Sequence, residues 1–366
     1  MINIFNIVLV VFIILSPVFF LPLSVPSIAT LQFHQFGFFG NSIDLFQLQF
    51  FCFSVSLLFG LSMFSKEINI YQNKLISLLL ILCLVNVYFH PKTIKIFPII
   101  LLGFILYHLV STYTNIKNLR LIFYSIAFVS VINTIISIFQ FFGIYLIISK
   151  KVEIFGLMGY KTQLGIYQAL AIPICYVLNP WLSIVPAIGL LLSKSGTAFI
   201  PAIIGMCYLL RKKLIRIQSP PIWLCFFTLI ALFIYKHSHQ LFLRFTAWVE
   251  AVRGGMNHLL IGNGIGIFNH STEIGPYNVA YTDPYSLYLQ IFHALGIFGV
   301  FLSILFILRS FINIPRGTLN QGLVASCLVL SVSGIGYSFL DYPRLAGTAI
   351  VLFGLLTIVK RTGYEN

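Results

Sequence analysis

The chain has 366 residues, of which 59% are hydrophobic and only 8% are charged. Such a composition excludes a water-soluble globular protein and is typical of a protein embedded in a lipid bilayer. The formal net charge of +14 indicates cytoplasmic anchors and attraction to anionic lipids, and it calls for no nucleic acid partner. We therefore predict a single integral membrane domain over residues 1–366.

The apolar runs predict an all-α polytopic protein with about twelve transmembrane helices, because a helix needs roughly 20 apolar residues to cross a bilayer. The expected spans are 5–23, 45–64, 75–90, 96–113, 121–148, 164–179, 181–193, 196–210, 222–236, 285–308, 322–338 and 345–359. The first run has no basic start and exceeds the length of a signal-peptide core, about 7–15 residues, so we expect an uncleaved span. The six cysteines all lie in apolar runs without a Cys-x-x-Cys pair, which predicts no metal site.

The densest basic run sets the expected orientation. Arg211, Lys212, Lys213 and Arg216 follow an expected span, and such runs stay in the cytoplasm. Counting spans from there places both termini in the cytoplasm and the long loop 237–284, expected to contain short helices, on the outer face between spans nine and ten. Ten basic residues then lie outside and twelve inside, so either the count is wrong by one span or the outer face serves an anionic substrate. The compact cluster at Arg211 favours the second explanation.

Three polar segments reach the expected outer face, at 150–165, 243–299 and 337–344. In the second segment Arg244 and Trp248 are four residues apart, so a helix there puts both on one face. Such a helix suits an enzyme that handles a lipid-linked substrate. It equally suits an amphipathic helix in the membrane interface, with its tryptophan among the head groups.

Other polar residues allow more than one interpretation. Glu250 and Arg253 are three residues apart on the same expected helix and can pair. His108 and His293 lie inside expected spans, where a histidine is either functional or a neutral imidazole bonded to a neighbouring helix. The string Gly262-Asn263-Gly264-Ile265-Gly266 has no strand-turn-helix context for a nucleotide site, so we expect its glycines to permit tight turns.

Taken together, these segments resemble the O-antigen ligase and polymerase superfamily of bacterial envelope glycosyltransferases, from about Val152 to Gly354. A pattern that opens a mid-chain span in that family is matched by Gly159, Gly165, Tyr167, Ala169, Leu170 and Pro173, with Tyr160 and Thr162 in place of two asparagines. An R-x-x-x-W element is matched by Arg244 and Trp248. A G-x-G-x-G-x-F string is matched from Gly262 to Phe268.

Two later elements complete the resemblance, and two positions depart from it. The D-x-H-S-x-Y-L element that closes the loop is matched from Asp283 onward, and the F-x-D/E-Y-P turn by Phe339, Asp341, Tyr342 and Pro343. Tyr285 stands where the family has histidine. Gly196 stands where it has arginine, with Lys194 two residues earlier. Because tyrosine is a poorer general base than histidine near neutral pH, Asp283 becomes the candidate proton acceptor.

The resemblance implies a GT-C-like fold in the bacterial inner membrane and transfer of a glycan from an undecaprenyl-diphosphate carrier to a glycan or lipid-sugar acceptor. It implies neither cofactor nor metal, and its expected partners include membrane lipids and a chain-length regulator. The expected catalytic residues are Arg244, Asp283 and Tyr285. The expected contacts to diphosphate or glycan are Lys161, Lys194, Trp248, Arg253, Asp341 and Arg344.

Several activities fit this expectation. We favour a repeat-unit polymerase for O-antigen, capsule or exopolysaccharide over a ligase that attaches finished polymer to the lipid A core. A transporter or flippase of lipid-linked glycans is the rival from another class, and it predicts charged residues buried at mid-bilayer. A non-catalytic scaffold stays open because of the tyrosine at position 285.

Overall fold

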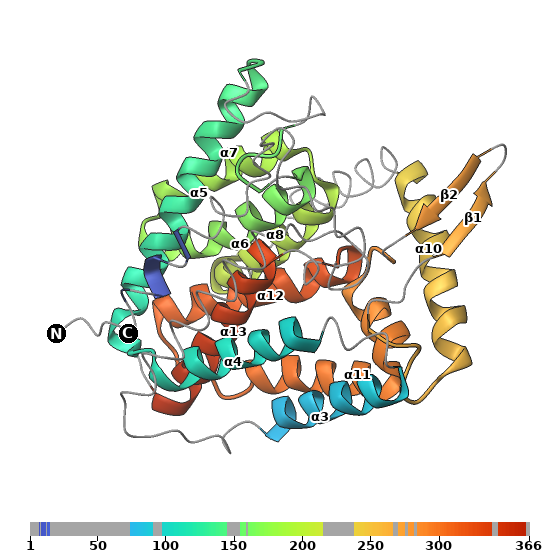
Figure 1. Ribbon diagram of the computed structural model, residues 1–366. Helices are drawn as coiled ribbons and strands as arrows, with labels where there is room; N and C mark the ends of the chain where they lie inside the picture. Colours follow the sequence, from blue (N-terminus) through green and yellow to red (C-terminus); the bar gives the residue numbers. More distant parts are fainter. Residues whose placement is uncertain are drawn as a thin grey trace, which may run out of the picture.

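A computed structural model of the protein describes residues 7, 9–11, 13–14, 74–90, 97–144, 154–158, 160–214, 238–265, 270–274, 277–281, 284–338 and 343–363. Within these ranges the elements are helical except for one antiparallel hairpin (Figure 1). The helices longer than one turn are α3 (Lys74–Phe89), α4 (Phe97–Tyr113), α5 (Leu119–Phe141), α6 (Lys161–Leu178), α7 (Ile184–Ser193), α8 (Gly196–Leu214), α10 (Ser238–Asn257), α11 (Leu287–Phe311), α12 (Thr318–Gly336) and α13 (Pro343–Thr362). The strands are β1 (His270–Ile274) and β2 (Tyr277–Tyr281).

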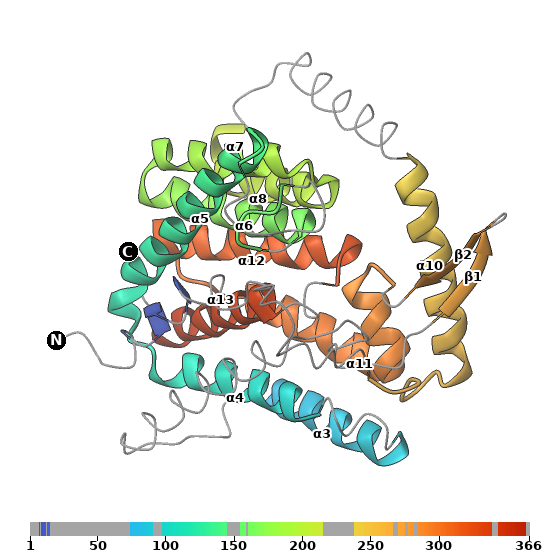
Figure 2. The same cartoon turned by 45° about the horizontal axis from the view of Figure 1, so that its top comes forward.

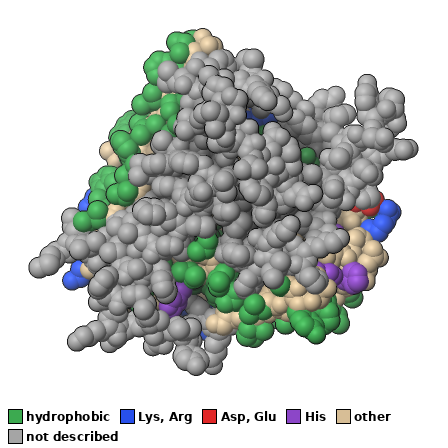
Figure 3. Space-filling model, in the orientation of Figure 1, with side chains coloured by type: hydrophobic (Ala, Val, Ile, Leu, Met, Phe, Trp, Pro, Cys, Tyr) green, Lys and Arg blue, Asp and Glu red, His purple; other side chains and the backbone are tan. Residues whose placement is uncertain are grey.

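Four helical stretches in the described residues are long and apolar enough to cross a membrane: Ile116–Phe141, Leu287–Phe311, Thr318–Gly336 and Leu345–Thr362. Large apolar side chains such as Phe128 on α5 and Phe301 on α11 are more than half exposed, a surface that suits lipid. Figure 3 shows hydrophobic side chains along the edge formed by α5, whereas charged and histidine side chains gather over α10. The protein is therefore a multi-pass α-helical membrane protein.

Nine of the twelve predicted spans fall on described residues, and each of the nine overlaps a helix. The predicted spans 45–64 and 222–236 lie outside the described residues, as does most of 5–23. The existence of the nine helices is thus confirmed, while only four stretches meet the length and composition of a full span. Twelve spans and a GT-C-like arrangement stay predictions.

Helix α12 lies at the centre of the bundle, between α6 and α8 on one side and α11 and α13 on the other (Figure 2). Small residues on α12 allow its neighbours to approach closely. A Cβ added to Gly322 would lie only 2.5 Å from the Val177 side chain of α6, so a larger residue would push the two helices apart. The Ser326 hydroxyl donates to the Leu170 carbonyl at 2.8 Å, which satisfies a buried polar group across the same contact.

The bundle has two distinct ends. Helices α6, α8, α11 and α13 begin, and α12 finishes, at the end where α10 and the hairpin lie, on the right of Figure 1. We call this the loop end. At the opposite end the Lys360 ammonium donates to the Arg309 carbonyl at 2.8 Å, so the last turns of α11 and α13 meet there.

One non-helical segment at the loop end, residues 154–158, is held by amide side chains of α5. The Gln140 Oε1 atom accepts hydrogen bonds from the backbone N–H groups of Phe155 and Gly156, each at 2.9 Å. The Asn133 Oδ1 atom accepts from the Leu157 N–H at 2.8 Å. Both amides are buried, so they satisfy backbone donors that would otherwise lie unpaired in the protein interior.

A second non-helical segment, residues 259–265, lies against a break in α11. Gly296 has φ 67° and interrupts the helix. The N–H of Ile297 donates to the Leu259 carbonyl at 2.8 Å, and the N–H of Asn263 donates to the His293 carbonyl at 2.8 Å. The backbone of the segment therefore replaces helical hydrogen bonds that the break removes.

Candidate functional site

Helix α10 packs on the first half of α11 through its small residues. Ala247 and Ala251 are fully buried, with Tyr285 and Leu289 against them. One turn later, a Cβ on Gly255 would lie 2.5 Å from the ring of Phe292. The predicted helix with Arg244 and Trp248 on one face is confirmed. In place of several short helices, however, the described part of loop 237–284 contains one helix of 20 residues and a hairpin.

Arg244 reaches from α10 to the end of α12. Its Nη1 atom donates to the Gly336 carbonyl at 2.8 Å, and its guanidinium lies 5.7 Å from the centre of the Tyr285 ring. Thr197, at the start of α8, adjoins the same glycine, since a Cβ there would lie 3.2 Å from its methyl group. We call Thr197, Arg244, Tyr285, Ser286 and Gly336 the junction. Four elements far apart in sequence meet in it.

The predicted lysines belong to the elements beside the junction. Gly165 of α6 packs on the turn between α7 and α8, where a Cβ would meet that of Ser195 at 2.5 Å. Lys161 precedes Gly165 by one helical turn, and Lys194 precedes Ser195 in the turn. The hydroxyl groups of Ser195 and Thr197 lie 3.2 Å apart, which links this turn to the junction.

Two predicted site residues adopt a left-handed backbone conformation. Of the residues that the structure describes, the non-glycine ones with positive φ are Lys194 (50°), Tyr285 (52°) and Asn313 (58°). This conformation costs a residue with a Cβ about 1–2 kcal/mol. Such strain is concentrated at functional sites in many proteins, and here it falls on two positions that the sequence singled out for other reasons.

Four helix starts place positive dipole ends at the loop end, beside the negative C-terminal end of α12. Helices α6, α8, α11 and α13 all begin here, and none has an acidic residue in its first turn. The N-terminus of a helix carries roughly half a positive charge and exposes N–H groups, so it favours an anion. Ser286, at the start of α11, makes no side-chain capping bond to that helix. Together with Lys161, Lys194 and Arg244, these helix ends favour a negatively charged ligand.

The remaining predicted site residues fall into three groups. Arg253 pairs with Glu250 at 2.7 Å, as predicted, and its side chain is 71% exposed. The Trp248 indole nitrogen is buried and has no hydrogen-bond partner within the described ranges. Asp283 and Asp341 lie outside the described residues. Arg344 lies in the first turn of α13, but its side chain is not described.

The two histidines and the glycine string that the sequence singled out lie in different environments. Within the described residues His108 Nε2 is buried without a partner, and the His293 ring lies against Gly254 of α10. Gly262 and Gly264 have φ of 73° and 105°, so the prediction that they permit tight turns is confirmed. No group of three His, Cys, Asp or Glu side chains suited to a metal ion occurs in the part of the chain that the structure describes.

Asn86 is an anchor that the sequence reasoning missed. Its side chain is fully buried in α3, and its Nδ2 atom donates to the carbonyls of Ile261 and Ala294, each at 2.9 Å. Its Oδ1 atom accepts from the Ile265 N–H at 3.2 Å. An asparagine in an otherwise apolar span was the available signal, because polar residues in spans are rare and make specific contacts.

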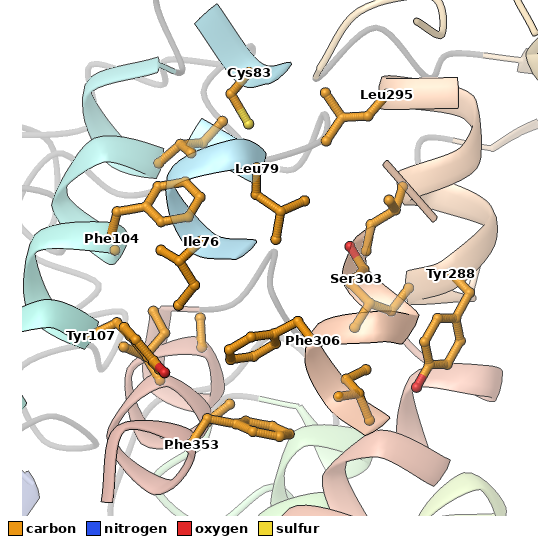
Figure 4. Close-up of a pocket in the computed structure, with 18 of the residues that line it drawn as sticks. Ile76, Leu79, Cys83, Phe104, Tyr107, Tyr288, Leu295, Ser303, Phe306 and Phe353 are labelled. Carbon is orange, nitrogen blue, oxygen red and sulfur yellow. The ribbon is translucent and has the colours of Figure 1, made fainter. Parts of the chain in front are cut away.

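An apolar cavity of about 270 Å³ lies between α3, α4, α11 and α13 (Figure 4). Phe104 and Tyr107 line one side and Tyr288 the opposite side, with Phe306 and Phe353 toward the end remote from Cys83. Among the described residues that line it, none is charged. Tyr288, in the first turn of α11, lines the cavity, and Tyr285, two residues before that helix begins, belongs to the junction.

Comparison with known proteins gives no family assignment. The sequence matches no model of a known protein family and no curated protein sequence. A functional assignment therefore depends on the chemistry of the junction and on the motif resemblance of the sequence.

Proposed function

We propose that this chain is a membrane glycosyltransferase that transfers a glycan from a polyprenyl-diphosphate carrier to a glycan or lipid-sugar acceptor at the loop end. The proposal includes membership of the O-antigen ligase and polymerase superfamily, twelve spans in a GT-C-like arrangement, and a periplasmic loop end with cytoplasmic termini in the bacterial inner membrane. Repeat-unit polymerisation is the activity we favour. The observation that carries the proposal is the junction itself. There Arg244, which matches one motif, lies together with Tyr285, which stands at the histidine position of another, beside the turn that carries Lys194.

The charge of the site supports an anionic leaving group. In glycan transfer from a lipid diphosphate, the acceptor hydroxyl oxygen bonds to the anomeric carbon as the bond from that carbon to the diphosphate oxygen breaks. The departing diphosphate gains negative charge, which cationic side chains and helix N-termini stabilise. A guanidinium has five N–H donors in a planar fork that matches phosphate oxygens, and the bond to the Gly336 carbonyl holds this fork at the junction.

Each predicted residue receives a role in this proposal. Arg244 stabilises the diphosphate, and Lys194 and Lys161 add point charges at the rim of the site. Asp283 accepts the proton of the acceptor hydroxyl, with Tyr285 positioning that hydroxyl. Trp248 and Asp341 contact the glycan, and Arg344 contacts the diphosphate from α13. Arg253 has a smaller role, because Glu250 already occupies its guanidinium.

Replacing Arg244 by alanine in the native host tests the proposal. We expect a loss of at least a hundredfold in polymeric envelope glycan on a gel, because the leaving group loses its nearest cation. Single-unit glycans left in the cell support a polymerase, and long polymer left on the carrier supports a ligase.

Arg309→Ala is the matched control, since it removes the same charge at the opposite end of the bundle and is expected to leave the glycan unchanged. Equal amounts of both variants in the membrane must be shown by immunoblotting. An unchanged glycan pattern with Arg244→Ala would overturn the transferase proposal and return the transporter and scaffold alternatives to first place.

A further inference from the structure

The cavity between α3, α4, α11 and α13 offers a ligand almost no polar contact. Three of its four hydroxyl-bearing residues already use their hydroxyl groups within the protein. The Tyr107 hydroxyl lies 2.7 Å from the Thr357 Oγ1 atom, and the Tyr288 hydroxyl donates to the Ser331 carbonyl at 2.7 Å. The Ser331 hydroxyl donates to the Cys327 carbonyl at 2.9 Å. Because water needs two to four polar partners to stay in a cavity, an apolar occupant is favoured here.

The size of the cavity suits one hydrocarbon chain. Its volume of about 270 Å³ lies near the lower limit for small-molecule pockets, roughly 300 Å³. The lining residues of α4 run from Ile100 to Tyr107, which corresponds to about 10 Å along a helix. A lipid with two chains would need roughly twice this space, so a single-chain lipid fits better.

Aromatic rings close the end of the cavity that lies furthest from the loop end. The ring centres of Tyr107 and Phe306 are 5.7 Å apart, and those of Phe306 and Phe353 are also 5.7 Å apart. These are ordinary edge-to-face and tilted contacts, so the three side chains form a packed floor. A hydrocarbon chain inserted here therefore has its tip at the aromatic floor, and the polar head group attached to its other end points toward the loop end.

The cavity and the junction share two short stretches of backbone. On α12, Ser331 lines the cavity, and Gly336, which accepts the bond from Arg244, lies five positions later, about 8 Å along the helix. On α11, Leu287 and Tyr288 line the cavity immediately after Tyr285 and Ser286 of the junction. One ligand can thus place an anionic head at the junction and an apolar chain in the cavity.

We propose that this cavity binds the hydrocarbon chain of a single-chain lipid with an anionic head group, the class that includes polyprenyl diphosphates. The identity of the head group rests on the proposed function, whereas the chain site rests on the cavity alone. The site fixes the lipid so that its phosphate-bearing end lies beside Arg244. Chain recognition then involves α3, α4 and α13, three helices that contribute none of the junction residues.

A photoreactive lipid tests the proposal with the full-length protein in nanodiscs. The probe is farnesyl diphosphate with a diazirine at the end of its chain, and mass spectrometry locates the labelled peptides. We expect labels on α4, α11 and α13 near the aromatic floor. Unlabelled farnesyl diphosphate should compete at least tenfold better than inorganic diphosphate, and a diazirine on a phosphatidylglycerol acyl chain should label these peptides at least tenfold less.

The critical variant is Gly103→Phe, which fills the cavity. Among the described residues, a Cβ at this position meets the Ile350 Cδ1 atom at 3.4 Å and no backbone atom within 4 Å, so the new ring has room to enter. We expect at least a tenfold loss of labelling on the three helices. Ile304→Phe is the matched control, because Ile304 lies on α11 between cavity residues but is 42% exposed, away from the cavity. Its labelling should equal that of the native protein.

Ala349→Leu provides a second filled cavity from α13, so that a folding defect in one variant does not decide the result. Only variants that melt at the same temperature as the native protein are compared, so that a folding defect is not mistaken for a filled cavity. Unchanged labelling in a folded Gly103→Phe or Ala349→Leu protein, or labels confined to the outer surface, would sink the proposal. Equal labelling by the phosphatidylglycerol probe would also contradict the proposal, because it would show that the cavity accepts any acyl chain.

The two proposals can fail separately. If labelling depends on Gly103 but Arg244→Ala leaves the envelope glycan unchanged, the chain site stands and the transferase falls. If Arg244→Ala abolishes the polymer while Gly103→Phe changes neither labelling nor polymer, the transferase stands and the chain site falls.

Discussion

The two non-helical segments at the loop end are held in opposite ways. Residues 154–158 lie on an unbroken helix, and the side chains of Asn133 and Gln140 bind their backbone. Residues 259–265 lie on a broken helix and bind it mainly backbone to backbone, and side chains of Asn86 and His90 also bind the segment. The first arrangement leaves α5 regular, whereas the second needs α11 to be interrupted at Gly296.

This difference predicts different roles for the two segments. The amide side chains of α5 bind the backbone of residues 154–158 and so fix the chain just before α6 begins. The break in α11 lies one residue after the cavity residue Leu295, and the half-helix before the break begins two residues after Tyr285 of the junction. We therefore expect substitutions near the break to affect both stability and ligand binding, and substitutions at the amides to affect stability alone.

The largest effect is expected for Gly262→Ala. The added Cβ would lie 2.4 Å from the carbonyl carbon and oxygen of Ala294, and the residue has a left-handed φ of 73°. These two effects should lower the free energy of unfolding by about 3–4 kcal/mol. Gly143→Ala is the control, because Gly143 has a φ of 80° but no described atom lies within 4 Å of its added Cβ, and it should cost about 1 kcal/mol. Equal melting temperatures of the two variants would show that the backbone contact with α11 contributes nothing.

A smaller effect is expected for Gln140→Ala. The change leaves the N–H groups of Phe155 and Gly156 unpaired in a buried place, which should destabilise the protein by about 2–3 kcal/mol. Ser137→Ala serves as the control. Within the described part of the chain its hydroxyl donates to the Asn133 carbonyl one turn earlier and to no other group, so a loss below about 1 kcal/mol is expected. Melting curves give the ranking, and loss of lipid labelling in a folded Gln140→Ala protein would contradict the assignment to scaffolding.

The smallest effect is expected for Lys194→Gly, and it has the opposite sign. Glycine adopts the φ of 50° without strain, so this variant should gain up to about 1 kcal/mol in stability. The same change removes a cation from the rim, and envelope glycan should fall several-fold. Lys194→Ala removes the charge but keeps the strained backbone, so it should lose glycan without the gain in melting temperature. A native glycan level in both variants would remove Lys194 from the site.

A large part of the fold could be read from local sequence. Helix ranges follow from apolar runs, because the preference for a bilayer is a property of roughly 20 consecutive residues. The pair Glu250 and Arg253 and the common face of Arg244 and Trp248 follow from helical spacing, and α10 has both features. The hairpin of β1 and β2 was not predicted, since its alternating polar residues give no strong signal within a long polar loop.

The sequence by itself determined the class of the protein, the helices and the residue types suited to an anionic substrate. Only the tertiary structure decided that Arg244 meets the Gly336 carbonyl, 92 positions away, and that Asn86 binds Ala294, 208 positions away. Only the tertiary structure revealed the cavity, whose lining comes from α3, α4, α11, α12, α13 and the loop residue Ile265. The physical reason is that span formation depends on neighbours along the chain, whereas these contacts and voids depend on how separate helices pack.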